Sequence, residues 1–305
     1  LNQGPLPPRV GQPTNFTIHF LLKNFATDIS NLEARAVLPE TGDFSKENLG
    51  PLVMWRFKAG SVPARIYFTT RSGGMSRTPY ESLNLGFHVG DDPETVRQNR
   101  ALLAGELGLE PGRLSSPRQR HTAVASVLND PGQAGTGAFG EVSVFDPCDA
   151  LMTQLANVPI LLHYADCVPV ALCGEGGSGP AVAVIHAGRK GLVAGVVESA
   201  TTMFAERMAV APEAAVAAIG PAIGPCCYEV DPQTASKFRE RFGARVASGG
   251  NHLDLRLATA SALKAAGVHG DNIHHLDICT SCDDSFFSYR RDGITGRHGA
   301  VAWLA

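Results

Sequence analysis

The sequence predicts a mixed α/β fold, in which sheets of mixed strand direction pack against helices. Short runs rich in Val, Ile, Leu and Ala cover residues 158–172 and 181–188. A glycine-rich segment at 174–179 separates these runs, as in buried strands joined by a tight turn. Apolar residues then recur at three-to-four spacing over 192–208, which is typical of an amphipathic helix packed on a sheet. Strands and helices in this order indicate a single α/β domain.

The chain divides into an N-terminal extension and this domain. Residues 1–62 begin proline-rich and then carry scattered apolar side chains without a sustained strand or helix period. We therefore expect a partly disordered extension over 1–62. The α/β domain is predicted to cover residues 63–305.

The remaining elements are predicted from local signals. Residues 66–70 form a strand-like run that enters a glycine-bearing loop, and a helix is expected to begin after Asp91 or Asp92, either of which can cap it. The later predicted elements are a strand at 214–220, a helix at 252–268 that ends at Gly267, and a strand at 300–304.

The composition favours a small-molecule partner. The 305 residues are 44% hydrophobic and 18% charged, with a net charge of -3, so a folded core is expected without an electrostatic reason to bind nucleic acid or an anionic membrane. The most apolar stretch carries His163, Asp166 and Cys167, which a bilayer disfavours, so we expect no transmembrane segment. Seven cysteines, an odd number, indicate free thiols in a reducing cytoplasm.

Three residues are candidate metal ligands: His121 in a polar loop, Cys167 after a hydrophobic strand, and His186 at the end of another. Zinc and copper sites use imidazole and thiolate ligands, and catalytic sites commonly keep one position open. Taken singly, each residue has an ordinary explanation, since buried cysteines often act as small apolar groups and strand-end histidines often bond the backbone.

Two loops are candidate anion sites. In HAGRKG at 186–191, Arg189 and Lys190 lie where a helix begins and where exposed amide groups favour phosphate, although a solvated basic turn has the same pattern. Arg71 and Asn84 can present a guanidinium and an amide to a sugar or a phosphate.

The other cysteines are weaker candidates. Cys279 and Cys282 form a single C-x-x-C pair, which is more often a packing or turn feature than a structural zinc site. Cys226 and Cys227 are adjacent, and neighbours in extended chain point in opposite directions, so we do not expect both to serve one metal site. A nearby group of arginines can either bind anions or face solvent; it consists of Arg290, Arg291 and Arg297.

Taken together, these motifs closely resemble the YfiH family of laccase-domain, polyphenol-oxidase-like proteins. The resemblance spans residues 66–304, and the joint order of its motifs is specific although none is so alone. The motifs are QRH at 119–121, ADCVP at 165–169, HAGRKG at 186–191, AIGPAIGPCCYEV at 218–230, LDLR at 253–256 and CTSCDDSFFSYRRDGITGR at 279–297.

The resemblance implies a cytoplasmic, monomeric enzyme that binds zinc through residues matching His121, Cys167 and His186. It implies a purine nucleoside phosphorylase that splits adenosine, inosine and methylthioadenosine with phosphate and also deaminates adenosine. In this reading Arg71 holds phosphate and Asp166 transfers a proton. The alternatives are a copper-dependent polyphenol oxidase, an enzyme that edits peptidoglycan precursors, and a non-catalytic zinc-binding module.

The chain departs from the family pattern beside the expected ligands. Arg189 replaces a tryptophan, Thr122 replaces a glycine, and Tyr164 stands where threonine is usual. If Arg189 and Lys190 face the pocket, we expect tighter binding of phosphate; if they project into solvent, they only aid solubility.

Overall fold

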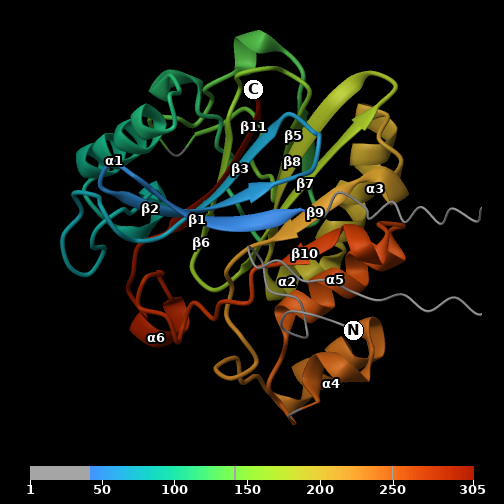
Figure 1. Ribbon diagram of the computed structural model, residues 1–305. Helices are drawn as coiled ribbons and strands as arrows, with labels where there is room; N and C mark the ends of the chain where they lie inside the picture. The colour runs from blue at the N-terminus through green and yellow to red at the C-terminus, as the bar shows by residue number, and fades with distance from the viewer. Residues whose placement is uncertain (1–41, 141, 249) are drawn as a thin grey trace, which may run out of the picture.

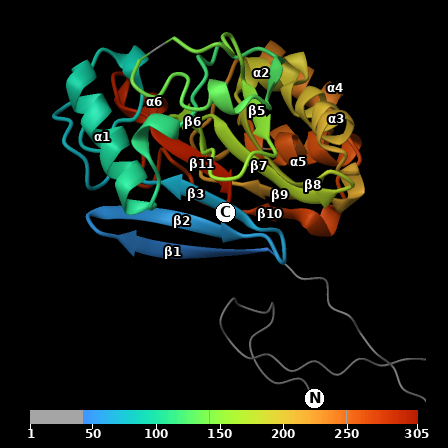
Figure 2. The same cartoon turned by 90° about the horizontal axis from the view of Figure 1, so that it is seen from above.

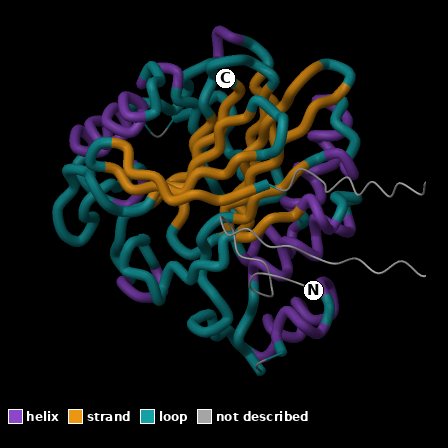
Figure 3. Tube along the Cα trace, viewed as in Figure 1, coloured by secondary structure: helices purple, strands orange, loops and turns teal. Residues whose placement is uncertain are grey.

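The protein is built in four layers, α/β/β/α. A computed structural model describes residues 42–140, 142–248 and 250–305. Two β-sheets pack against each other at the centre, with α1 (Pro93–Glu106) on the outer side of one sheet and the later helices on the outer side of the other (Figures 1 and 2). The tube in Figure 3 shows the strands gathered between these helical layers. The predicted mixed α/β class with a single domain is confirmed.

The first sheet is antiparallel throughout and has five strands in the order β1-β2-β3-β11-β6. Its strands are β1 (Asp43–Leu49), β2 (Leu52–Lys58), β3 (Ala64–Thr69), β6 (Ile160–Tyr164) and β11 (His298–Leu304). The last strand, β11, thus lies between β3 and β6, so the first and the last strands of the described chain belong to the same sheet.

The second sheet is mixed and has six strands in the order β10-β9-β7-β8-β5-β4. Its strands are β4 (Ala125–Leu128), β5 (Ala150–Thr153), β7 (Val168–Gly176), β8 (Gly179–Ala187), β9 (Val216–Ile219) and β10 (Ile273–His275). The central strands pair antiparallel, while β4 with β5 and β9 with β10 pair parallel. The predicted turn at 174–179 is confirmed, because β7 and β8 form a hairpin with Gly176 opposite Gly179.

Both faces of the second sheet are buried, which explains its continuous apolar runs. Along β7, Val168, Val170 and Leu172 face the helices, whereas Ala171 and Cys173 face the first sheet. Successive strand residues point to opposite faces, so a strand that is apolar at every position must be covered on both.

Four helices, α2 to α5, cover this outer face. They are α2 (Arg189–Ala194), α3 (Val196–Met208), α4 (Pro232–Phe242) and α5 (Leu255–Ala265); a short helix α6 (Tyr289–Asp292) lies apart from them (Figure 1). The helix predicted at 192–208 is interrupted at Gly195, whose φ of +91° is left-handed and ends α2. Asp92 is the cap of α1, since its side chain accepts a hydrogen bond from the Thr95 amide.

The apolar run at 158–172 divides between the two sheets. Strand β6 belongs to the first sheet and β7 to the second, so the chain crosses from one sheet to the other at residues 165–167. Asp166 lies at the crossing with a φ of +87°, a left-handed conformation. The crossing places Cys167 at the edge of the interface between the sheets.

The predicted extension reaches into the described part of the chain. Strands β1 and β2 lie within residues 1–62, and β2 is hydrogen bonded to β3 across the predicted boundary. Leu52, Met54 and Phe57 of β2 are fully buried. Residues 1–41 lie outside the described residues. Among the described helices, none combines the length and the apolar character that crossing a membrane requires.

Candidate metal centre and its cleft

His121, Cys167 and His186 converge at one point. One nitrogen of each imidazole and the Cys167 Sγ all lie within 4.8 Å of one another. His121 Nε2 is 3.7 Å from the Cys167 Sγ, and the two imidazole rings are 4.7 Å apart and nearly perpendicular. The hairpin accounts for part of this, because Pro169 pairs with His186 and so brings Cys167 close to it.

Asp149 fixes two of the three candidate ligands. Its carboxylate lies 2.8 Å from His186 Nδ1 and accepts hydrogen bonds from the backbone amides of His121 and Thr122. The bond to Nδ1 leaves Nε2 of His186 as the nitrogen that faces Cys167. His121 itself has a φ of +59°, so the carboxylate also stabilises an uncommon backbone conformation.

The donor set fits a zinc ion. Thiolate and imidazole are the ligands that zinc prefers, and three protein ligands leave a fourth position open. In tetrahedral geometry with bonds of about 2.0–2.3 Å, neighbouring ligand atoms lie roughly 3.5 Å apart, close to the observed separation of His121 Nε2 and Cys167 Sγ. Gly188 lies against the site, since a Cβ atom there would lie 2.8 Å from both Cys167 Sγ and His121 Cδ2.

The three groups also shift each other's protonation. Burial alone would raise the pKa of Cys167, but His186 and His121 lower it to about 6. Burial alone would lower the pKa of His186, but Cys167 and Asp149 raise it to about 9. A thiolate beside an imidazolium is therefore favoured even without a metal.

The triad opens into a cleft of about 600 Å³, a size suited to a small metabolite. The cleft is lined by His88, Gln119, Arg120, His121, His163, Ala165, Asp166, Cys167, His186, Tyr228, Tyr289, Arg290 and Arg297. Burial and the neighbouring Arg297 lower the pKa of His88 to about 4, so this histidine is neutral near pH 7. His88 therefore adds no positive charge to the cleft, which is lined by Arg120, Arg290 and Arg297.

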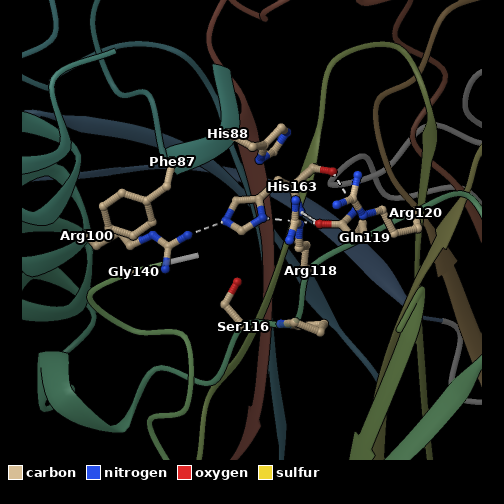
Figure 4. A pocket seen from close by; sticks show the side chains of 10 residues that line it. Phe87, His88, Arg100, Ser116, Arg118, Gln119, Arg120, Gly140 and His163 are labelled. Atoms are coloured by element: carbon tan, nitrogen blue, oxygen red, sulfur yellow. Dashed lines mark hydrogen bonds between the residues drawn. The ribbon is translucent and has the colours of Figure 1, made fainter. Parts of the chain in front are cut away.

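A smaller cavity of about 280 Å³ adjoins the cleft and shares His88, Gln119, Arg120 and His163 with it. Figure 4 shows the Arg100 guanidinium directed at the His163 ring, with Gln119 on the other side of that ring. Arg100 Nη2 donates to His163 Nε2 at 2.8 Å, and His163 Nδ1 lies 3.1 Å from Gln119 Oε1. Burial, followed by Arg100, holds the pKa of His163 well below its ordinary value, so the ring is neutral.

Comparisons with known proteins show which family this chain belongs to. The family model described as multi-copper polyphenol oxidoreductase laccase matches residues 65–305. The chain belongs to this YfiH laccase-domain family. A purine nucleoside phosphorylase of Corynebacterium glutamicum is 35% identical over 79% of this chain and 95% of its own length. The purine nucleoside phosphorylase YlmD of Geobacillus stearothermophilus is 38% identical over 78% of this chain and 88% of its own length.

The solved structures of the YfiH family share the fold. The crystal structure of the hypothetical protein YfiH of Bacillus licheniformis superposes with a TM-score of 0.76 at 30% identity. The superposition covers 86% of this chain and 99% of the chain of the Bacillus protein. The family match begins at residue 65, so the strands β1 and β2 precede the region that the family model matches.

Asp166 lies in the wall of this cleft beside Cys167. Its two carboxylate oxygens accept one hydrogen bond each, from the Thr280 hydroxyl at 2.8 Å and from the Arg290 amide at 2.7 Å. A carboxylate has further lone pairs beyond these two. Asp166 therefore both ties the loop of α6 to the metal centre and keeps accepting capacity at the cleft.

Three predicted residues, Arg71, Asn84 and Arg189, are not among the residues that line the cleft, whereas Arg290 and Arg297 of the predicted arginine group are. Arg71 donates to the Glu81 carbonyl at 2.7 Å and lies over the Phe287 ring at 4.8 Å. Asn84 is fully buried, and its amide oxygen accepts from the Arg297 amide at 2.9 Å, so it positions a cleft residue from behind. Arg189 Nη1 lies 3.3 Å from the Thr234 hydroxyl at the start of α4.

Sequence reasoning missed Asp149 and misjudged the adjacent cysteines. Asp149 lies in a weak pattern, FDPCDAL, and its role depends on contacts with residues 28 and 37 positions away. The expectation that Cys226 and Cys227 point apart is wrong, because they occupy a tight turn rather than extended chain: the Cys227 amide donates to the Gly224 carbonyl at 3.0 Å. Both thiols lie within 4.8 Å of those of Cys279 and Cys282.

Proposed function

We propose that this protein is a zinc-dependent purine nucleoside phosphorylase that also deaminates adenosine. The observation that carries the proposal is the His121, Cys167 and His186 triad at the base of an arginine-lined cleft. The names of the Corynebacterium and Geobacillus relatives support the substrate class, a purine nucleoside together with phosphate. Adenosine, inosine and methylthioadenosine are the substrates we would test first.

The triad is proposed to hold Zn²⁺ with one coordination position available. When bound, zinc supplies Lewis-acid activation of an oxygen nucleophile. Cys167 favours the thiolate form that coordinates a metal, whereas His186 must lose a proton before its Nε2 can coordinate. Asp149 then keeps the remaining Nδ1 proton and orients the ring.

The arginines are proposed to hold phosphate near the ribose. Arg120 lies in the lining of both the cleft and the adjoining cavity, and Arg297 lines the cleft beside a neutral His88. Arginine suits phosphate because its planar donors form paired hydrogen bonds with the oxygens. Arg71, for which a phosphate role was predicted, is not among the residues that line the cleft, so we assign the first contact to Arg120 and Arg297.

In phosphorolysis, a phosphate oxygen bonds to the anomeric carbon while the glycosidic C–N bond breaks. The bonding electrons go to the purine nitrogen, which takes up the proton that the hydrogen phosphate gives up, and positive charge develops on the ribose in between. We propose that Asp166 carries this proton from the phosphate to the base, since Asp166 lines the cleft and its carboxylate is held by Thr280 and Arg290. Tyr228 and Tyr289 in the lining offer aromatic faces for the base.

Deamination uses the same cleft without phosphate. Water adds to the purine C6, ammonia leaves, and adenosine becomes inosine. The two reactions share the nucleoside site and differ in the oxygen nucleophile, so one metal centre suffices for both.

The test is to incubate the purified protein with each nucleoside with and without phosphate. We expect free base and ribose 1-phosphate only with phosphate, and inosine from adenosine without it. Cys167→Ala should lose both the triad metal and both reactions. Bound zinc without turnover of any nucleoside would instead favour a non-catalytic zinc module, and turnover of peptidoglycan precursors alone would favour cell-wall editing.

A copper oxidase is the second candidate, because the family model carries that description. A multi-copper enzyme needs several metal ions close together for reduction of oxygen. In residues 42–140, 142–248 and 250–305, two groups of His, Cys, Asp or Glu converge tightly enough to bind a metal, the triad and a group of four cysteines. Copper bound in stoichiometric amount with rapid oxygen consumption on a phenol would favour the oxidase.

A further inference from the structure

Two turns that are far apart in the sequence bring four thiols together. The Sγ atoms of Cys226, Cys227, Cys279 and Cys282 all lie within 4.8 Å of one another. The Cys282 Sγ is 3.5 Å from that of Cys226 and 3.3 Å from that of Cys227. We propose that these four cysteines, the tetrathiolate cluster, form a second metal site that binds a structural Zn²⁺ ion.

The separations match a tetrahedron rather than a disulfide. With zinc–sulfur bonds of about 2.3 Å, the sulfur atoms of a tetrahedral site lie roughly 3.8 Å apart. The sulfur separations of 3.3 Å and 3.5 Å, with an upper limit of 4.8 Å, bracket that value. A disulfide would join two of the four sulfurs at about 2.05 Å, and Cys282 has two nearly equidistant partners.

Both pairs of cysteines lie in backbone turns that direct their side chains to one side. The Cys227 amide donates to the Gly224 carbonyl at 3.0 Å, and the Cys282 amide donates to the Cys279 carbonyl at 3.1 Å. In such turns adjacent side chains do not point in opposite directions as they do in a strand. The adjacent pair and the C-x-x-C pair can therefore contribute two ligands each.

Gly224 allows the two turns to approach each other. Its amide donates to the Cys279 Sγ at 3.2 Å, which is the kind of hydrogen bond that stabilises a thiolate. A Cβ atom at this position would lie 3.2 Å from the Cys226 Sγ and 3.4 Å from the Cys279 Sγ, so a side chain would crowd the sulfurs.

Two arginines bind the turns that carry the cysteines. Four thiolates and one Zn²⁺ ion leave two negative charges. Arg290 Nη1 donates to the carbonyl of Cys227 at 3.0 Å, and Arg291 Nη1 donates to the carbonyl of Thr280 at 3.0 Å. Each guanidinium thus binds one cysteine turn, and because Arg291 is also paired with Asp292 at 2.8 Å, Arg290 is the cation whose charge favours bound thiolates.

The role of this site is structural, because four protein ligands leave no open position on the ion. None of the four cysteines is among the residues that line the cleft, but Tyr228 and Arg290, which follow the two turns, are. The metal would therefore fix one wall of the cleft from behind. This proposal does not depend on which reaction the cleft catalyses.

The experiment is metal analysis of the full chain purified without added metal. We expect two zinc ions per chain in the wild type, one in Cys167→Ala, one in Cys279→Ser and none in the double variant. Cys173→Ala is the matched control, because Cys173 is buried between the sheets and belongs to neither group of ligands. This variant should keep two zinc ions per chain. Hydrogen exchange should become faster at 224–230 and 279–283 in Cys279→Ser but not in Cys167→Ala.

A measurement on the wild type covers the case in which Cys279→Ser does not fold. Cobalt-loaded protein should show the intense visible absorption of a tetrahedral tetrathiolate in addition to the bands of the triad. A single zinc ion that Cys167→Ala removes completely would overturn the proposal. So would an intact mass lower by the hydrogens lost in a disulfide among these four cysteines.

Discussion

At the scale of single residues, Asp149 explains how loop and strand groups become one metal centre. Its carboxylate binds the His186 ring and the amides of His121 and Thr122, so one side chain sets both a ligand's orientation and another ligand's backbone. The hydrogen bond from His186, together with those from Thr122, overcomes the effect of burial and lowers the pKa of Asp149 to about 2. It therefore stays ionised across the physiological pH range.

We predict that Asp149→Asn weakens zinc binding at the triad by about 10–100-fold, because the neutral amide no longer stabilises the ring proton. Competition with a chromophoric chelator measures this change. Asp130→Asn is the control, since Asp130 caps a surface turn and asparagine can replace it there. Equal zinc affinity in the two variants would show that Asp149 is not a positioning residue for the metal.

His298 predicts an acid-sensitive core. It is 1% exposed, its two ring nitrogens have no hydrogen-bond partner among the described residues, and burial lowers its pKa to about 3. Between that value and the unfolded pKa of about 6.5, the unfolded chain binds one more proton than the folded chain. The stability contributed by a neutral His298 is therefore fully present above about pH 6.5 and is lost progressively as the pH falls.

We predict that His298→Leu reduces the pH dependence of the unfolding free energy between pH 6.5 and 4 by up to roughly 1.4 kcal/mol per pH unit. Urea unfolding at several pH values measures this slope. His269→Leu serves as the comparison, because the His269 side chain is 64% exposed. Parallel pH profiles for wild type and His298→Leu would contradict the assignment.

At the scale of elements, the sequence predicted where strands lie better than it predicted which sheet each strand joins. Period and composition located β3, β8, β9 and β11, because each is a buried apolar run between turn residues. The division of 158–172 into β6 and β7 could not be predicted, since both halves are equally apolar and the break depends on the left-handed Asp166. The break after α2 at Gly195 was likewise hidden within a continuous apolar stripe.

The candidate ligands were predictable for a different reason. Each of His121, Cys167 and His186 was visible as a polar residue beside an apolar strand or in a loop, but only the joint order of motifs indicated that they meet. Asp149 and the tetrathiolate cluster were not predictable, because their contacts cross 27 to 56 residues of chain. Local spacing carries no information about such pairs.

The loop that begins α2 gives a prediction at this scale. Arg189 lies against Thr234 of α4, and it is not among the residues that line the cleft, whereas Arg120 lines both cavities. We predict that Arg120→Ala weakens phosphate binding about tenfold or more and reduces its salt dependence, while Arg189→Trp leaves both unchanged. Phosphate titration at two ionic strengths measures the effect. If only Arg189→Trp lost phosphate affinity, the phosphate would bind at the start of α2 instead.

At the scale of the whole molecule, two sheets share one core that also holds the site in place. Phe57 of β2 packs between the first sheet and the edge strand β10 of the second sheet. The centroid of its ring is 4.8 Å from that of Phe44 on β1 and 5.3 Å from that of His274 on β10. It is fully buried with the residues between the sheets. The strands that precede the family match are thus packed against the far edge of the second sheet.

We predict that Phe57→Ala lowers the unfolding free energy by about 3–5 kcal/mol, because it leaves a cavity between the sheets that the surrounding strands cannot fill. Phe139→Ala, at a ring that is 49% exposed, should change the stability by less than about 1 kcal/mol. Urea unfolding followed by tryptophan fluorescence and by circular dichroism should give one coincident transition in each variant, since Trp55 lies on β2 and Trp303 on β11 of the same sheet. An early separate transition in Phe57→Ala, with the main transition unchanged, would mean that β1 and β2 fold as an appendage. A single shifted transition requires instead that the strands outside the family match belong to the cooperative unit that positions His121, Cys167 and His186.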